Sequence, residues 1–249
     1  LVTSTFEYFP GVPIFRSRNL VNWEQIGHCL TRKSQLNLDG ISSSGGIYAP
    51  VIRHHEGRFY MVTTDTTGIG NFYVYADDPA GDWSEPIRVD QGGIDPSLFF
   101  DDDGKVYLIS GNRSPYPIEE LSPDLRSFVV DAPKRSLNER MGEGHHLYKI
   151  NGKYVDVSAI PGATTDQMVA IADSIDGPWR VERMVQGESL GVTTVAIDRA
   201  TAGDRGLTLH QGGIVDTPSG QWWSIIMSDH GSAGRMVNLV PVTWDKGFP

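Results

Sequence analysis

An internal repeat is the feature of this sequence that most restricts its fold. A turn glycine, a polar residue and an aromatic strand segment recur four times, as Gly57-Arg58-Phe59-Tyr60, Gly104-Lys105-Val106-Tyr107, Gly152-Lys153-Tyr154-Val155 and Gly220-Gln221-Trp222-Trp223. The four glycines are 47, 48 and 68 residues apart. A second aromatic residue follows each glycine after 24 to 27 residues, as Trp83, Phe128, Trp179 and Trp244. A period close to 47 residues is typical of a four-stranded propeller blade.

The remaining sequence favours an all-β chain. Segments such as 59–63, 106–109 and 222–226 are short, aromatic and β-branched, and Gly, Asp, Asn or Pro residues bound them. No long segment has a convincing apolar period of 3.6 residues. Since one blade cannot bury both of its faces alone, the repeats are expected to stack around an axis. An irregular β-sandwich with chance similarity between its turns is the alternative.

The start of the chain does not contain a complete copy of the repeat. Trp23 matches the second aromatic residue of each copy, which we call its aromatic mark, and is the fifth of these marks. No glycine turn stands at the matching distance before it. The repeat spacing aligns residues 1–4 with residues 61–64 of the next copy. The sequence therefore predicts a single domain over residues 1–249, an all-β, five-bladed β-propeller whose first blade lacks its N-terminal strand or strands.

Composition excludes several classes of function. The 249 residues include 31 acidic and 21 Lys or Arg residues, a formal net charge of −10, which argues against binding to nucleic acid. No apolar run reaches the length of about 18 residues that a membrane span needs. Cys29 is the one cysteine, so neither an internal disulfide framework nor a Cys-rich zinc site is expected. The run 101–104, Asp-Asp-Asp-Gly, favours a solvated hairpin turn over a calcium loop.

Two carboxylates stand at matching places in the repeat. Asp95 and Glu143 each precede their turn glycine by nine residues, and Tyr48 does the same in the preceding copy. The innermost strand of each blade lines the propeller channel, so these side chains are expected to face one cavity. Two facing carboxylates can differ in pKa, with one charged and the other protonated. Glycoside hydrolysis needs that division of roles. The alternative is structural, with Asp95 capping the turn before Pro96 and Glu143 in a surface ion pair.

Several segments resemble glycoside hydrolase family 43, the β-xylosidase and α-L-arabinofuranosidase group. They are Thr5-Phe6-Glu7-Tyr8-Phe9-Pro10-Gly11-Val12-Pro13-Ile14, Leu20-Val21-Asn22-Trp23-Glu24-Gln25-Ile26-Gly27-His28, Ser44-Gly45-Gly46-Ile47-Tyr48-Ala49-Pro50, Asp95-Pro96-Ser97-Leu98-Phe99, Glu143-Gly144-His145-His146-Leu147-Tyr148 and Pro241-Val242-Thr243-Trp244. They cover essentially the whole chain in order. The resemblance implies the same five-bladed propeller that the repeat predicts.

The resemblance also implies roles for individual residues. Glu143 matches the general acid of an inverting enzyme, and Asp95 matches the residue that orients this acid and tunes its pKa. Phe6 and Tyr48 match aromatic residues that line the pocket for the terminal sugar, although related β-xylosidases usually carry Trp where Tyr48 stands. Arg235 matches an Arg that contacts the terminal sugar. Ala49 and Thr165 are weaker pocket candidates.

The family's third carboxylate, the general base, has no counterpart that we can assign in this sequence. In the family it is an Asp in a Pro-Asp-Pro segment ahead of the motif at residues 5–14. We therefore expect a truncated chain that binds sugar but is catalytically impaired. Many relatives carry a C-terminal β-sandwich after the segment that matches residues 241–244, and we expect this domain to be absent as well.

The histidines depart from the family pattern in one respect. Many members carry Gly-His before the last inner strand, whereas this chain has Leu209-His210-Gln211-Gly212-Gly213-Ile214, with the histidine one place earlier. His210 near the channel axis beside a structural calcium ion or a water molecule is one interpretation, and a packed or surface position is the other. Strand alternation is expected to send His145 and His146 to opposite faces. No His and Cys set has zinc spacing, and the chemistry itself needs no cofactor.

Three classes of function follow from these observations. The first is an exo-acting glycosidase that removes terminal xylosyl or L-arabinofuranosyl residues from xylan, arabinoxylan or arabinan. The second is a sugar-binding propeller without catalysis. The third is another five-bladed carbohydrate enzyme, such as an endo-arabinanase or a fructan hydrolase. The segment at residues 6–11 favours the first class, so an oligosaccharide or polysaccharide is the expected partner, with no nucleic acid or membrane.

Overall fold

The protein is described by a computed structural model that covers residues 1–89, 91–137, 141–160, 166–186, 209–229 and 234–249. All regular elements within these ranges are β-strands, and none of the described segments is a helix. The described residues thus include no helix that is long and apolar enough to cross a membrane. The all-β prediction is confirmed.

The chain divides into two compact units, one formed by residues 1–113 and 117–134 and the other by residues 114–116 and 135–249. The first unit contains β1 (Gly11–Ser17), β2 (Trp23–Leu30), β3 (Val51–His55), β4 (Arg58–Asp65), β5 (Gly70–Ala76), β6 (Ile87–Arg88), β7 (Ile94–Phe100) and β8 (Val106–Gly111). It also contains all of β9 (Tyr116–Leu121) except Tyr116, which belongs to the second unit. The second unit contains β10 (Arg135–Leu137), β11 (Glu143–Ile150), β12 (Lys153–Ile160), β13 (Asp166–Ala172), β14 (Arg180–Gln186), β15 (Leu209–Asp216), β16 (Trp222–Asp229) and β17 (Arg235–Val242).

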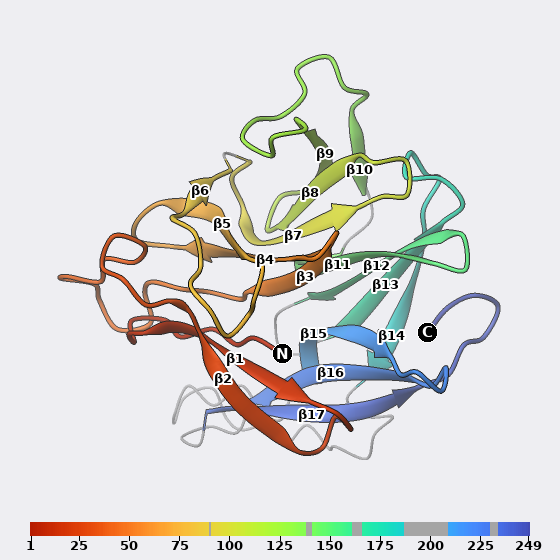
Figure 1. The fold of residues 1–249 in the computed structure, drawn as a ribbon. Helices are drawn as coiled ribbons and strands as arrows, with labels where there is room; N and C mark the ends of the chain where they lie inside the picture. The colour runs from red at the N-terminus through yellow and green to blue at the C-terminus, as the bar shows by residue number, and fades with distance from the viewer. Residues whose placement is uncertain (90, 138–140, 161–165, 187–208, 230–233) are drawn as a thin grey trace, which may run out of the picture. The chain divides into compact units, whose positions relative to one another are not determined.

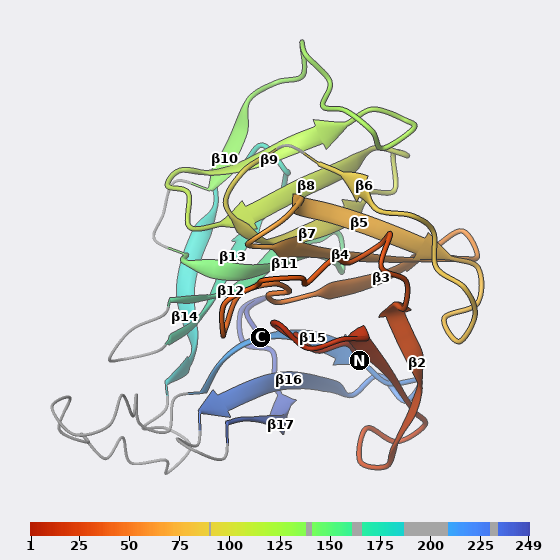
Figure 2. The same ribbon diagram turned by 90° about the vertical axis from the view of Figure 1, so that its left-hand side faces the viewer.

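Within each unit the strands form antiparallel meanders in chain order (Figure 1). The first unit contains the order β3-β4-β5-β6 and the run β7-β8-β9, and the second contains β11-β12-β13-β14 and β15-β16-β17. Figure 2 shows β3, β4 and β5 following one another in the same sheet. Meanders of three or four strands that follow one another along the chain are what propeller blades consist of. The described residues thus form four sheets of the blade type.

The predicted turn glycines all lie in the hairpin between the first and second strands of these four sheets. Gly57, Gly104, Gly152 and Gly220 have φ values of 82°, 82°, 76° and 78°, and a Cβ atom at any of them would meet nothing within 4 Å. Glycine is therefore needed for its backbone conformation, not for space. Two of the hairpins have two-residue loops, Glu56-Gly57 and Asn151-Gly152, whereas 101–105 and 217–221 are five-residue loops.

A fifth, smaller sheet pairs β1 with β2 near the start of the chain. Trp23 opens β2 after β1, just as Trp83 follows β5 in the next sheet. These strands therefore correspond to the third and fourth strands of a blade. Val2 forms an antiparallel bridge with Ile14 of β1. The alignment of residues 1–4 with residues 61–64 of β4 predicts this pairing.

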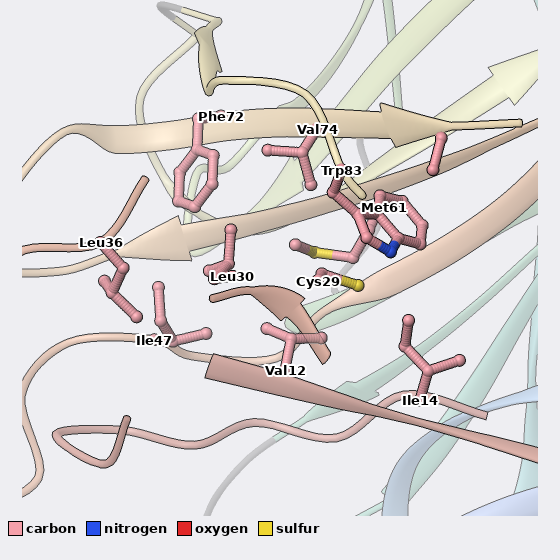
Figure 3. Close-up of a cluster of buried hydrophobic side chains, with 11 residues drawn as sticks. Val12, Ile14, Cys29, Leu30, Leu36, Ile47, Met61, Phe72, Val74 and Trp83 are labelled. Atoms are coloured by element: carbon pink, nitrogen blue, oxygen red, sulfur yellow. The ribbon is translucent and has the colours of Figure 1, made fainter. Parts of the chain in front are cut away.

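The core of the first unit packs β1 and β2 against β4 and β5. Its buried members include Val12, Cys29, Met61, Phe72 and Trp83, which Figure 3 shows gathered between the strands that carry Val12 and Phe72. Burial raises the pKa of the Cys29 thiol well above its ordinary value. A second core in this unit joins Val51 and Val62 to Leu98 and Leu108. The second unit has a core of its own, centred on Val157, Val169 and Ile214.

Candidate active site

The structure brings two of the predicted pocket aromatics together in the first unit. Phe6 and Ile47 exchange backbone hydrogen bonds of 2.9 and 3.1 Å, so the segment around Phe6 pairs with the segment just before β3. The rings of Phe6 and Tyr48 then meet edge to face, with centroids 5.7 Å apart. Ala49 follows Tyr48 and is half-buried. Phe6, Tyr48 and Ala49 are thus close together within the first unit.

Glu7 fixes a neighbouring loop beside this aromatic pair. Its carboxylate accepts hydrogen bonds from the Ser44 backbone N–H at 3.1 Å and from the Ser43 hydroxyl at 3.2 Å. A hydrogen bond from its own backbone N–H lowers the pKa of Glu7, and the bonds from Ser44 and Ser43 lower it further. The Glu7 carboxylate thus stabilises the loop that precedes Tyr48.

Asp95 lies in the same unit, in a β-bulge at the start of β7. Ile94 pairs with Gly111 and Ser97 with Ile109, so one extra residue stands between them, and Asp95 has a φ of 53°. The Asp95 side chain is buried, with 2% of its surface exposed. Its backbone N–H donates to the Thr64 hydroxyl at 3.1 Å, while the Tyr48 N–H donates to the Thr64 carbonyl at 2.9 Å. Thr64 of β4 therefore joins Tyr48 and Asp95.

A buried chain of hydrogen bonds supports the Asp95 bulge. The Thr64 hydroxyl donates to Asn71 Oδ1 at 2.6 Å, and Asn71 Nδ2 donates to the Gly92 carbonyl at 2.9 Å. The Ser110 hydroxyl donates to the same carbonyl at 2.8 Å. The backbone before and at Asp95 is thereby fixed, which matters because a non-glycine residue at positive φ is strained.

Glu143 lies in the second unit, at an equivalent bulge in β11. It pairs with Ala159 and is half-buried, and the next ladder pair is His146 with Val157, so Gly144 and His145 form the bulge. Gly144 has a φ of 65°. A Cβ atom on Gly144 would come within 2.6 Å of the Gln211 side chain, so glycine also allows this close approach.

The register corrects the prediction that Asp95 and Glu143 occupy equivalent places. Glu143 corresponds to Ile94, the last paired residue before the bulge, whereas Asp95 corresponds to Gly144 within the bulge. The shared distance of nine residues to the turn glycine arises because the hairpin loops differ in length. The two carboxylates therefore stand one register position apart in their own sheets.

A third bulge holds the segment that carries His210. His210 pairs with Met227 and Gly212 with Ile226, which leaves Gln211 as the extra residue, with a φ of 55°. The buried side chain of Gln167, from β13, accepts from the Gln211 N–H at 2.8 Å and donates to the Gly212 carbonyl at 3.0 Å. His210 thus takes the register position of Glu143 in its own sheet.

The structure says less about the remaining predicted residues. Arg235 is exposed and opens β17, opposite Asp229. Thr165 lies outside the described residues. Asp101–Asp103 form a hairpin loop as expected, although the Asp101 side chain is buried. Among the described residues no group of three or more His, Cys, Asp or Glu side chains is arranged to hold a metal ion. The calcium ion beside His210 stays a prediction.

Sequence reasoning did not find the buried polar residues around Glu143. His145 is fully buried whereas His146 is half-buried, and His145 Nδ1 lies 2.7 Å from Asp156 Oδ2. The hydroxyl groups of Tyr116 and Ser158 also form hydrogen bonds with the backbone just before Glu143. Asp156 and Ser158 sit in a strand that reads from the sequence as an ordinary buried strand, so only the pairing register could reveal them.

The fold and these bulged strands define the protein as a β-propeller with four blade-type sheets in its described part. The family model that matches the chain is Glycosyl hydrolases family 43, over residues 1–249. The chain therefore belongs to glycosyl hydrolase family 43.

Individual relatives agree with this assignment. A "Xylosidase/arabinosidase" of Butyrivibrio fibrisolvens is 36% identical over all of this chain and 51% of its own length. The "Non-reducing end alpha-L-arabinofuranosidase BoGH43B" of Bacteroides ovatus is also 36% identical, over all of this chain and 48% of its own. The solved structure of "Bacteroides ovatus Xyloglucan PUL GH43B" is 33% identical, with a TM-score of 0.82 over 98% of this chain and 50% of that one. The chain thus spans about half the length of these relatives.

Proposed function

We propose that the protein is an inverting exo-glycosidase that removes terminal xylosyl or L-arabinofuranosyl residues from plant hemicellulose. The observation that carries the proposal is that a chain of this family holds Asp95 inside one braced bulge and Glu143 directly before another. Relatives that are 36% identical are described as a xylosidase/arabinosidase and as an arabinofuranosidase, which supports this substrate class.

In this proposal Glu143 is the general acid. An inverting glycosidase needs a carboxylic acid that protonates the leaving oxygen and a carboxylate that activates water on the opposite face of the sugar. A half-buried carboxyl group whose backbone is fixed on both sides suits the first task. Asp95 is the residue that orients Glu143 and favours its protonated form by its own negative charge. No residue of this chain is proposed as the general base.

Aromatic and basic side chains complete the proposed site. The edge-to-face pair of Phe6 and Tyr48 offers an apolar wall for the terminal sugar ring. Arg235 supplies hydrogen-bond donors for the hydroxyl groups of the sugar. Ala49 and Thr165 are further candidates for the pocket wall. We also propose five blades, in which β1, β2 and the residues around Val2 belong to the first. A structural calcium ion or a water molecule beside His210 remains part of the proposal.

The test of this function compares Glu143→Ala and Glu143→Gln with the wild type in the full-length protein. The substrates are aryl β-D-xylopyranosides and aryl α-L-arabinofuranosides that carry good or poor leaving groups. Loss of the acid should lower kcat by about 10²- to 10⁴-fold on poor leaving groups and by much less on good ones. Full activity of both variants on every substrate would show that Glu143 is not the acid. Sugar binding without hydrolysis by the wild type would support the non-catalytic alternative.

A further inference from the structure

We propose that the buried pair formed by His145 and Asp156 positions Glu143 for proton transfer. This inference rests on the proposed role of Glu143 as general acid. His145 Nδ1 and Asp156 Oδ2 are 2.7 Å apart, and both side chains are completely buried. With the carboxylate ionised, this bond requires the imidazole proton to be on Nδ1. His145 is two residues after Glu143, so the pair fixes the backbone on the C-terminal side of the acid.

The pair is isolated from other hydrogen bonds in the described part of the chain. There, His145 Nε2 and Asp156 Oδ1 are buried and find no hydrogen-bond partner. The ring of Tyr116 packs against the imidazole instead, with centroids 5.0 Å apart. Removal of one member would leave the other buried and unpaired, which is strongly unfavourable. The bond between His145 and Asp156 is therefore what holds the imidazole in place.

A second set of contacts holds the backbone on the other side of Glu143. The Gly142 N–H donates to the Tyr116 hydroxyl at 2.9 Å. The Ser158 hydroxyl donates to the Met141 carbonyl at 2.8 Å, and Ser158 is fully buried. Tyr116 therefore contributes to both sides, through its hydroxyl group to Gly142 and through its ring to His145.

The sequence around Glu143 explains why such anchors are needed. Gly142 and Gly144 flank the acid, and both have positive φ values, 95° and 65°. Neither residue has a side chain with which to hold its own backbone. Glycine is also the residue that changes conformation most freely. The nearest side chain that can anchor the segment after Glu143 is the imidazole of His145.

The chemistry sets how much this positioning matters. A misplacement of about 1 Å can cost about 100-fold in rate, and a general acid contributes about 10²- to 10⁴-fold. A displaced acid impairs departure of a poor leaving group, whereas a good leaving group departs with little help. Loss of the anchor should therefore resemble a partial loss of Glu143. General destabilisation of the fold should lower activity on all substrates alike.

The test compares two pairs of variants in the full-length protein. His145→Leu and Asp156→Ala break the bond. His145→Asn keeps a donor near the position of Nδ1, and Asp156→Asn keeps an acceptor. For the breaking variants we expect kcat to fall about 10- to 100-fold on aryl glycosides with poor leaving groups, but less than about 3-fold on those with good ones. The conservative variants should retain most of the wild-type activity.

Controls separate positioning from stability and from the proposed function. Gly152→Ala changes the far end of β11 and should leave the dependence on leaving group as in the wild type. Should the breaking variants fail to fold, Tyr116→Phe and Ser158→Ala remove the contacts on the other side and should each steepen this dependence. Equal losses on good and poor leaving groups in all folded variants would overturn the inference. If Glu143→Ala itself shows no such dependence, the acid assignment fails instead.

Discussion

Tyr73 carries the clearest pH dependence among the individual residues. It lies on β5 in a buried cluster with 2% of its surface exposed, and burial raises its pKa to about 12. An exposed tyrosine in the unfolded chain ionises near pH 10. Between about pH 10 and 12 the unfolded state therefore loses a proton that the folded state keeps. Since the unfolded state then binds fewer protons, the free energy of unfolding falls as pH rises.

The substitution Tyr73→Phe tests this pH dependence, because it keeps the ring and removes the ionisable group. Wild-type stability should fall by about 1 kcal/mol per pH unit from this residue within that window, which is about 2 kcal/mol between pH 10 and 12. Urea unfolding at pH 9, 10 and 11 should therefore give a flatter profile for the variant. Parallel profiles for the two proteins would contradict the prediction.

At the residue scale, residues that a particular backbone conformation requires could be predicted from the sequence. Residues that depend on contacts with distant parts of the chain could not. Gly57, Gly104, Gly152 and Gly220 could be predicted, because a hairpin loop with positive φ favours glycine wherever it occurs. Phe6 and Tyr48 were expected in the same pocket from the resemblance, but their ring contact was not predicted. The pair of His145 and Asp156 could not be predicted, since 11 residues separate them and only the bulged register of β11 against β12 brings them together.

At the scale of single elements, the two ends of β11 differ in what they tolerate. Gly142 precedes the strand with a φ of 95°, and a Cβ atom there would lie 2.0 Å from the Ala159 carbonyl oxygen. Gly152 follows it with a φ of 76°, and its Cβ would meet nothing within 4 Å. Both positions disfavour alanine because of φ, but only Gly142 also faces a steric conflict with backbone.

Substitution by alanine at these two glycines should therefore have unequal effects. Gly152→Ala should lower the free energy of unfolding by about 1–2 kcal/mol, the cost of a left-handed conformation. Gly142→Ala should cost about 1–3 kcal/mol more, because the carbonyl of Ala159 has to move. Urea unfolding of both variants measures the difference. Similar losses in the two would indicate that the close approach of Gly142 to Ala159 does not determine its residue type.

The strands and turns of each blade could be predicted from the sequence, whereas the exact pairing register could not. The meander of each blade follows from strands of regular length separated by turn residues, and such local signals are present in the sequence. A bulge adds one residue without altering the residue types around it. Because β7 and β11 each contain one extra residue at the bulge, the offset of one register position between Asp95 and Glu143 comes from their hairpin loops. Hairpin loops of two and five residues made the two distances equal by coincidence.

At the scale of the whole molecule, the repeat was sufficient to predict the fold class. Each copy contributes a sheet with its own turn and aromatic mark, so an error within one copy does not alter the architecture. The four blade-type sheets of the described residues agree with this expectation. Substrate preference does not follow in the same way, because xylose and arabinofuranose are pentoses of similar size. Relatives described as xylosidase/arabinosidase and as arabinofuranosidase match this chain with equal identity.

The mode of attack can be tested more directly than the preference between the two sugars. A terminal-acting enzyme removes one sugar per encounter, so linear xylotetraose or arabinotetraose should first give a monosaccharide and a trisaccharide. An enzyme that cuts internally, as an endo-arabinanase does, would give disaccharide at the earliest times. Chromatography of products at low conversion distinguishes the two, with Glu143→Ala as the control for contaminating activity. Disaccharide as the first product from either substrate would contradict terminal action while leaving the acid assignment of Glu143 intact, because both modes of attack need a proton for the leaving oxygen.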